Sequence, residues 1–237
     1  MKTFIRTPRL FIHVLLGLTL AGVSGCYSSG YRKGEGAARS LQRASTEVQN
    51  ESRDIDVTLD ALKNLITQPA ADLRPQFRKF SAAVDRLEDS ARQTERTRER
   101  VLEKSADYFE TWDEHVTGIH YERIRAQSEA RKTEVTNHLH AISTRYQEAE
   151  DVVRALITYF KDIRTALSVD LTLAGLDSVK EIVSNAEQNA GKVKVALSQL
   201  SDELASSGTS MSSMAVRSPP QHSGESRTPV RTEVKSE

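Results

Sequence analysis

Apolar residues recur at spacings of three and four along the chain between residues 37 and 205, and this periodicity constrains the fold most strongly. Such spacings place side chains on one face of an α-helix, and a repeat of seven is typical of helices that pack along a shared line of core residues, here called the seam. No segment carries the alternation of a strand. The sequence therefore predicts an all-α fold, an elongated antiparallel helical bundle or coiled coil of about four long helices.

The pattern divides into four helices, each expected to be roughly 45 to 75 Å long at about 1.5 Å per residue. The first is expected over about 37–67, where Leu41, Val48, Ile55 and Leu62 recur every seventh residue. The others are expected over about 75–117, 120–167 and 170–205. Pro75 suits the first turn of a helix, and Asp170 and Thr172 are both candidates for the N-cap of the fourth. Short connections favour antiparallel neighbours.

The second helix has a seam that is polar in its middle. Its members are Phe77, Phe80, Val84, Leu87, Ala91, Thr94, Arg98, Val101, Ser105, Tyr108 and Trp112. A polar seam residue usually fixes the register or the choice of partner at some loss of stability. Arg98 therefore has two interpretations of equal weight: it specifies packing within the bundle, or the helix is unpaired there and open to another protein.

An aromatic and acidic cluster lies at the end of the same helix. Tyr108, Trp112 and His115 belong to it, and Trp112 is the single tryptophan of the chain. One interpretation is a pocket for a ligand or a partner. The other is that Tyr108 and Trp112 fill the bundle where two helices meet, and their places on the seam favour this one.

The N-terminus has the features of a bacterial lipoprotein signal. Residues 1–25 comprise a basic segment and an apolar run of about 14 residues, which is too short to span a bilayer. The run ends in Val23-Ser24-Gly25-Cys26, which resembles a lipobox. By that resemblance Cys26, the single cysteine, becomes a lipidated N-terminus. Tyr27 replaces the aspartate that favours the inner membrane, so we expect an anchor in the outer membrane that faces the periplasm.

Two segments flank the predicted helices. Residues 26–36 are expected to form a lipidated cysteine and a flexible Gly/Ser tether before the helical domain at 37–205. Residues 206–237 are rich in Ser, Pro and Thr with few large apolar groups, so we expect a disordered tail. The tail has four basic residues, so binding to an anionic polymer such as the cell wall is a lesser alternative.

Charge and motifs argue against several classes of function. Residues 1–25 hold three basic groups and no acidic ones, which leaves 30 basic and 33 acidic groups in the rest. This balance does not fit a nucleic-acid partner. The chain shows no phosphate-binding glycine loop, nucleophile elbow or metalloprotease helix, and its histidines lack the spacing of a metal site. We expect no enzyme, no cofactor and no metal.

Four segments resemble a known family: Leu73–Lys79 (LRPQFRK), Asp107–Glu114 (DYFETWDE), Glu122–Glu134 (ERIRAQSEARKTE) and Ser168–Lys180 (SVDLTLAGLDSVK). They are similar to the bacterial family filed as domain of unknown function 2959, whose members are predicted lipoproteins or secreted coiled-coil proteins. The resemblance covers residues 59–117 and 120–204, and the first helix and the tail fit it less well. It implies a helical envelope protein and supplies no activity.

Together these features predict a non-enzymatic envelope protein, anchored by lipid, that acts as a helical spacer or docking surface. We expect its partners to be the membrane and either another envelope protein or a second copy of the chain. The alternative is a periplasmic protein that binds a small ligand or lipid near Tyr108, Trp112 and His115.

Overall fold

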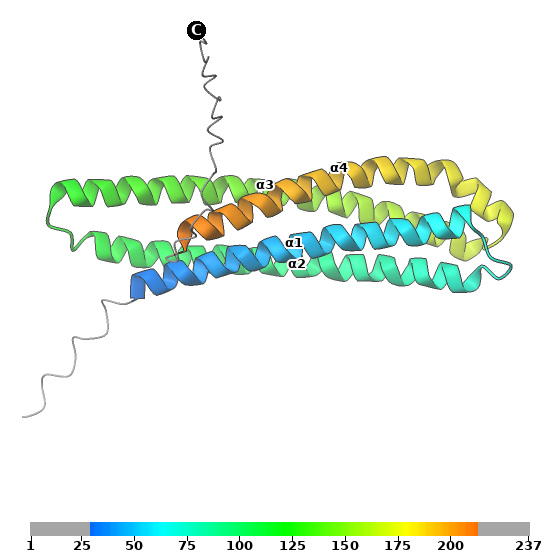
Figure 1. Ribbon diagram of the computed structural model, residues 1–237, viewed down its shortest axis with the longest axis horizontal. Coiled ribbons are helices and arrows are strands. Elements are labelled where there is room, and N and C mark those ends of the chain that lie inside the picture. Colours follow the sequence, from blue (N-terminus) through cyan, green and yellow to red (C-terminus); the bar gives the residue numbers. More distant parts are fainter. Residues whose placement is uncertain (1–28, 213–237) are drawn as a thin grey trace, which may run out of the picture.

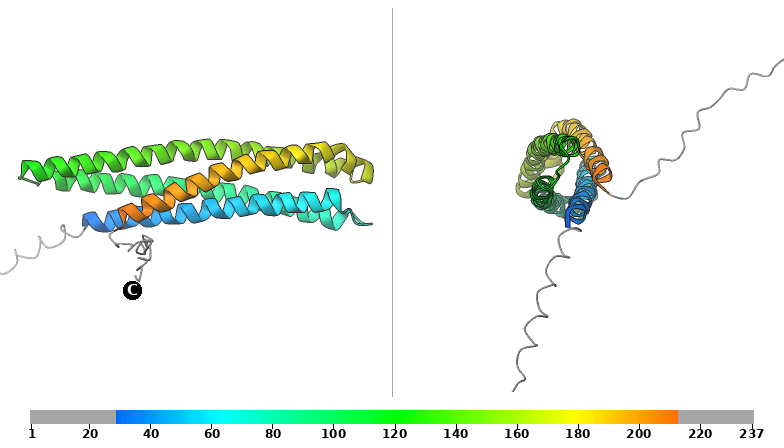
Figure 2. Two further views of the ribbon diagram at one scale, coloured as in Figure 1. Left: turned by 45° about the horizontal axis from the view of Figure 1, so that its top comes forward. Right: turned by 90° about the vertical axis from the view of Figure 1, so that its left-hand side faces the viewer.

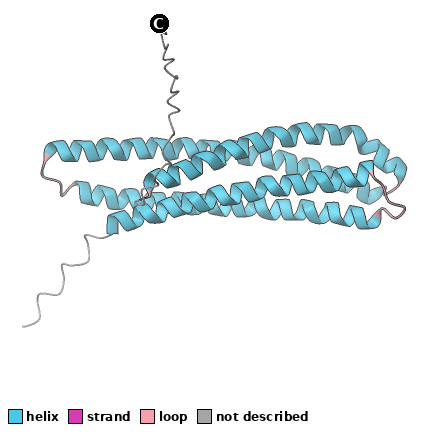
Figure 3. Cartoon of the chain, viewed as in Figure 1, coloured by secondary structure: helices cyan, strands magenta, loops and turns pink. Residues whose placement is uncertain are grey.

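The structure is a computed structural model that describes residues 29–212, and these residues form four long α-helices. They are α1 (Ser29–Thr67), α2 (Arg74–Val116), α3 (Glu122–Val169) and α4 (Leu173–Met211). Successive helices run antiparallel along one long axis and are joined by short loops (Figures 1 and 3). The predicted all-α elongated bundle of four helices is confirmed.

The helices close into a ring when the bundle is viewed from its end (Figure 2). Helix α1 packs against α2 and α4, and α3 packs against the same two neighbours. In the diagonal pairs α1–α3 and α2–α4, no two Cα atoms lie within 8 Å of each other in the described chain. Each apolar seam therefore turns toward a common interior, which is the arrangement expected when every connection is too short to cross the bundle.

Large apolar side chains concentrate where α1 joins α2 and α3 joins α4. Phe80 of α2 and Phe160 of α3 are fully buried there, with ring centroids 6.5 Å apart in an edge-to-face arrangement. Leu62, Leu65 and Leu167 are buried in the same core. Burial of each such side chain contributes about 1.5 to 3 kcal/mol, so this end anchors the fold.

Side chains also define the two turns at this end. Gln76 donates to the Asn64 side-chain oxygen at 2.8 Å and to the Gln68 carbonyl at 2.9 Å, and so closes the α1–α2 turn. At the α3–α4 turn the hydroxyl of Thr172 accepts from the Gly175 amide at 3.1 Å. Of the two N-cap candidates, the structure therefore selects Thr172.

The N-terminal boundary of the first helix differs from the prediction. Residues 29–36, expected to lie in a flexible tether, are helical and pack on α2. A side chain at Gly34 would lie only 3.1 Å from the ring of Tyr108. Glycine was interpreted as a source of flexibility, whereas here its missing side chain lets α1 approach an aromatic residue closely. Residues 26–28 lie outside the described residues.

The C-terminal boundary also differs, because α4 continues to Met211 rather than ending near residue 205. Ser207 and Gly208 are buried, and a Cβ atom at Gly208 would lie 3.0 Å from the Ala38 carbonyl oxygen of α1. Small residues allow two helices to approach closely, which stabilises a segment that lacks large apolar groups. The rest of the predicted disordered tail, residues 213–237, lies outside the described residues.

The turn between α2 and α3 projects beyond the first residue of α1 and the last residue of α4 in both side views (Figures 1 and 2). Tyr121 and Ile124 at this tip are 70% and 54% exposed. Within residues 29–212, no helix combines the length and apolar character needed to cross a membrane.

Candidate functional site in the middle of the bundle

Polar seam residues from three helices meet halfway along the bundle. In α1 the buried residues Ala44, Glu51, Thr58 and Leu65 follow one another at intervals of seven, so Glu51 occupies a core position. Helix α2 contributes Thr94 and α3 contributes Tyr146, both buried. The polar centre of the α2 seam is thus part of a polar layer inside the bundle.

Glu51 is the least expected member of this layer. It is 3% exposed, and no ion pair neutralises its carboxylate within the described chain. Burial, together with smaller contributions from the nearby carboxylates Glu150 and Asp54, raises the pKa of Glu51 to about 7. The Thr94 hydroxyl lowers the pKa in part, although its geometry falls short of a hydrogen bond. The side chain therefore titrates near neutral pH instead of near 4.5.

Arg98 has its charge partner within the bundle, although its Nε is buried without a hydrogen-bond partner. Its guanidinium donates to Glu150 of α3 at 3.2 Å, and both side chains are largely buried. Burial is the main cause that raises the pKa of Glu150, and Arg98 opposes it. Of the two interpretations of Arg98, the structure favours the one in which it specifies how the helices pack.

A cavity of about 200 Å³ adjoins the polar layer. Glu51, Thr94, Tyr146 and Glu150 line one part of it, and apolar side chains from α3 and α4 line another. Those apolar residues are Ala149, Val153, Ile157, Leu197 and Leu200. All four helices therefore contribute to one amphipathic cavity.

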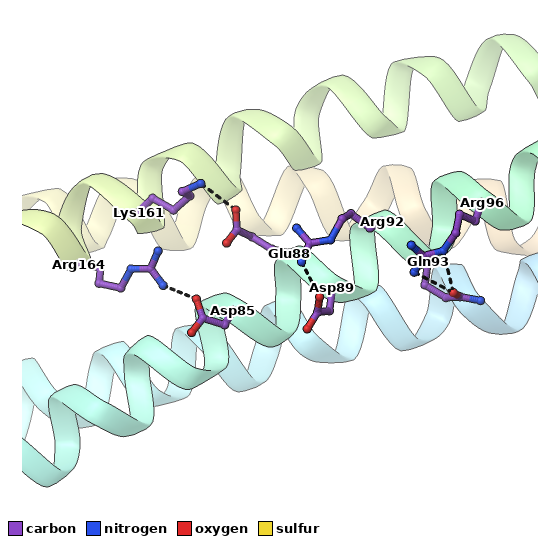
Figure 4. A network of polar contacts seen from close by, with 8 residues as sticks. All are labelled: Asp85, Glu88, Asp89, Arg92, Gln93, Arg96, Lys161 and Arg164. Carbon is purple, nitrogen blue, oxygen red and sulfur yellow. Dashed lines mark hydrogen bonds and ion pairs between the residues drawn. The ribbon is translucent and has the colours of Figure 1, made fainter.

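The cavity opens between α2 and α3, where the exposed residues Arg92, Glu95 and Arg154 lie at its rim. Ion pairs join the two helices on either side of this opening: Lys161 with Glu88 at 2.8 Å, and Arg98 with Glu150 at 3.2 Å. Figure 4 shows the first of these pairs, with Arg92 one turn further along α2. The opening is about 15 Å long at 1.5 Å per residue.

A second ion pair secures the same side of the opening. Arg164 of α3 lies 2.6 Å from Asp85 of α2, next to the Lys161–Glu88 pair (Figure 4). Both pairs follow one antiparallel register, since a step of three along α2 matches a step of three back along α3. Exposed pairs of this kind contribute at most about 1 kcal/mol each, so they set the register more than the stability.

The aromatic cluster predicted as a contact site lies near the C-terminal end of α2, away from this cavity. The rings of Tyr108 and Trp112 are 5.2 Å apart, and the Trp112 indole donates to Ser128 of α3 at 2.9 Å. Tyr108 faces Gly34 of α1. Both aromatic residues thus contact neighbouring helices, which favours their interpretation as packing residues. His115 is exposed and its Nδ1 lies 2.7 Å from the Thr111 carbonyl oxygen.

The sequence-based search did not identify Glu51, Tyr146 or Glu150 as site residues. The sequence held one signal for Glu51: it lies three residues after Val48, one of the apolar residues that recur every seventh position, and so falls on the buried face of the helix. Cys26, the predicted lipidation site, lies outside the described residues. Within residues 29–212, no three His, Asp or Glu side chains are grouped so that they could hold a metal ion.

The fold and the cavity define a class: an antiparallel four-helix bundle with an amphipathic, partly buried site between its helices. The chain belongs to the family described as "Protein of unknown function (DUF2959)", whose sequence model matches residues 25–214. The match includes all of α1, which the earlier resemblance covered only in part. No curated protein matches the chain.

Proposed function

We propose that the chain is a lipid-anchored protein of the bacterial cell envelope, whose bundle acts without catalysis as a rigid spacer and docking body. The observation that supports this proposal most directly is the short stretch of chain between the predicted lipidation site and the helical bundle. Cys26, at the end of the lipobox-like segment, stands three residues before Ser29, the first residue of α1. Three residues span at most roughly 10 Å, so a lipid on Cys26 would hold the end of the bundle at the membrane surface.

The projecting α2–α3 turn suits the same placement. Gly30 of α1 lies level with Thr111 of α2, because a side chain at Gly30 would contact the Thr111 methyl group. The α2–α3 turn, which contains Tyr121, lies beyond the first residue of α1 along the long axis of the bundle (Figure 1). Exposed Tyr121 and Ile124 at the tip are residue types that suit a membrane interface.

The opposite end would then stand away from the membrane by the length of the bundle. Helix α1 alone has 39 residues, which corresponds to about 58 Å. Val169 and Leu173 at the α3–α4 turn are 85% and 63% exposed there. We propose this end as the contact for another envelope protein or a second copy of the chain. Because Tyr27 is not aspartate, we place the anchor in the outer membrane, facing the periplasm.

Two substitutions test the anchor and its location. Cys26→Ala removes the acceptor sulfur, so the protein should move from the membrane fraction to the soluble fraction. Tyr27→Asp keeps the sulfur and should move the protein from the outer to the inner membrane. Mass spectrometry of the N-terminal peptide would show the acyl chains directly. Membrane retention of the Cys26→Ala protein, with no acyl chains on the parent, would overturn the proposal.

A second candidate function is the binding of a small ligand. The cavity at Glu51 and Tyr146 favours it. Beside this open space the Tyr146 hydroxyl is buried without a hydrogen-bond partner, and buried Glu51 forms no ion pair within residues 29–212. This moves the proposed ligand site from Tyr108, Trp112 and His115 to the middle of the bundle. Co-purified small molecules, released by denaturing the protein and identified by mass spectrometry, would test it.

A further inference from the structure

The polar layer is costly unless something completes it. Tyr146 is 1% exposed and its hydroxyl has no hydrogen-bond partner. The Thr94 hydroxyl and one carboxylate oxygen of Glu150 are also buried without a partner. Each such group forfeits hydrogen bonds that it would make in water, and apolar residues of similar size would pack a simple spacer better. The same groups border a cavity, so a bound molecule could satisfy them.

The charges around the cavity indicate what kind of molecule this is. Arg92 pairs with Asp89 and Arg154 pairs with Asp151, so the acidic neighbours neutralise both rim arginines. Glu88 and Glu150 are neutralised by Lys161 and Arg98.

Two carboxylates are left over. Glu51 and Glu95 border the cavity and form no ion pair within residues 29–212. The lining therefore has acceptors and negative charge to spare, and it calls for a ligand with positive charge and hydrogen-bond donors.

The apolar part of the cavity lining determines the chemical character and size of the rest of the ligand. Val153, Ile157, Leu197 and Leu200 contribute apolar surface to the same cavity as the polar groups. An apolar cavity of about 150 Å³ holds benzene, so a cavity of about 200 Å³ accommodates one ring or a short chain with a polar end. Long lipids and peptides exceed this volume.

We propose that the mid-bundle cavity binds a small primary ammonium compound with a compact apolar body, with the ammonium group at Glu51 and Tyr146. The inference rests on the second candidate function and is independent of the lipid anchor. The ammonium group would donate to the Glu51 carboxylate and to the Tyr146 hydroxyl oxygen, while the apolar body would lie against Leu197 and Leu200. Entry would occur between α2 and α3, through the opening between the two ion pairs.

Phenethylamine and its neutral isostere 2-phenylethanol are suitable probes, because they differ in the ammonium group and little in shape. Isothermal titration calorimetry at pH 8 with the full-length chain should show phenethylamine bound at least tenfold more tightly than 2-phenylethanol. Equal affinities would overturn the ammonium specificity and leave the small-ligand function standing. No binding of either probe, with ordered water found in the cavity, would overturn both.

Variants separate binding from folding. Glu51→Gln removes the charge but keeps the shape, so it should lower the affinity for phenethylamine at least tenfold while the melting temperature stays equal or rises. Ala149→Met fills the cavity and should abolish binding with Glu51 intact. Glu181→Gln, on the exposed face of α4, is the matched control and should bind like the parent. Unchanged affinity in both Glu51→Gln and Ala149→Met would place the probe elsewhere and refute the site.

Discussion

Arg98 of α2 and Glu150 of α3 form an ion pair of 3.2 Å in the middle of the bundle, whereas Glu51 of α1 is buried in the same layer without a counter-charge. The polar centre of the bundle is therefore compensated on one side only. The fold tolerates this because the large apolar core lies nearer the α1–α2 and α3–α4 turns, around Phe80 and Phe160. Packing therefore does not by itself explain the polar residues at the centre, which are available for a function.

Replacement of Arg98 by methionine should destabilise the bundle by about 1 to 3 kcal/mol, because Glu150 would be left partly buried and unpaired. Urea denaturation followed by circular dichroism would measure the change. Arg131→Met breaks an exposed pair with Glu134 on α3 and should change stability by less than about 0.5 kcal/mol. The double variant Arg98→Met with Glu150→Leu should recover most of the loss. Equal effects of the two single variants would contradict a structural role for the Arg98–Glu150 pair.

The stability of the protein should depend on pH through Glu51. Its pKa lies near 7 in the folded state and near 4.5 when unfolded, so its unfavourable contribution is absent below about pH 4.5. That contribution grows as the pH rises and is complete above about pH 7. The groups that face it are Asp54 of α1, Thr94 of α2, and Tyr146 and Glu150 of α3, while α4 presents leucines.

Glu51→Gln should therefore raise the free energy of unfolding by up to about 3 kcal/mol at pH 8 and leave it nearly unchanged at pH 4.5. Urea denaturation at both pH values would measure this difference. Glu181→Gln serves again as the exposed control and should show no such pH dependence. A gain of equal size at both pH values would mean that Glu51 is not charged in the folded protein.

Two glycines of α4 should respond oppositely to alanine. At Gly191 a Cβ atom would meet nothing within 4 Å, so Gly191→Ala should stabilise the helix by about 1 kcal/mol through its higher helix propensity. At Gly208 the same atom would lie 2.9 Å from Gln42 and 3.0 Å from the Ala38 carbonyl oxygen. Gly208→Ala should therefore lower the melting temperature despite the gain in propensity. Equal stabilisation by both would mean that α4 does not pack on α1 at residue 208.

Trp112 should behave as a packing residue. Trp112→Phe keeps the ring but loses the hydrogen bond to Ser128, at a cost of about 1 kcal/mol, whereas Trp112→Ala should cost about 2 to 3 kcal/mol because the side chain is half-buried. Thermal denaturation would rank the two variants. A nearly unchanged melting temperature of Trp112→Ala, together with loss of a binding partner, would restore the interpretation of this cluster as a contact site.

The proposed orientation at the membrane predicts which end of the rod meets lipid. In the Trp112→Phe background, a tryptophan at Tyr121 should be quenched by brominated phospholipids when the lipidated protein is reconstituted in vesicles. A tryptophan at Val169, at the opposite end, should retain its fluorescence. Quenching of both positions would mean that the bundle lies flat on the bilayer, and quenching of Val169 alone would reverse the orientation.

The helices themselves were largely predictable, because their seams recur every three and four residues. The middle boundaries agree closely: α2 was expected over about 75–117 and is Arg74–Val116, and Thr172 was one of two expected N-caps. The outer boundaries were wrong because Gly34, Ser207 and Gly208 were interpreted as flexible. Their small size permits close helix approach only when another helix is present, and sequence periodicity does not describe that helix.

The site was predictable only in part. Thr94 and Arg98 stood out as polar residues on an apolar seam. Glu150, the partner of Arg98, and Glu51, which lies near Thr94, are each more than 40 residues away in the chain. The aromatic cluster around Trp112 attracted attention because of its composition, although its members pack between helices.

The sequence alone determined the secondary structure, the antiparallel order and the presence of polar seam positions, because each depends on local spacing and on short connections. Only the tertiary structure decided that Glu51, Thr94, Tyr146 and Glu150 share one layer beside a cavity. That outcome depends on the relative register of four helices. The register is set by distant pairs such as Lys161 with Glu88, and by the fit of small residues such as Gly208 against α1.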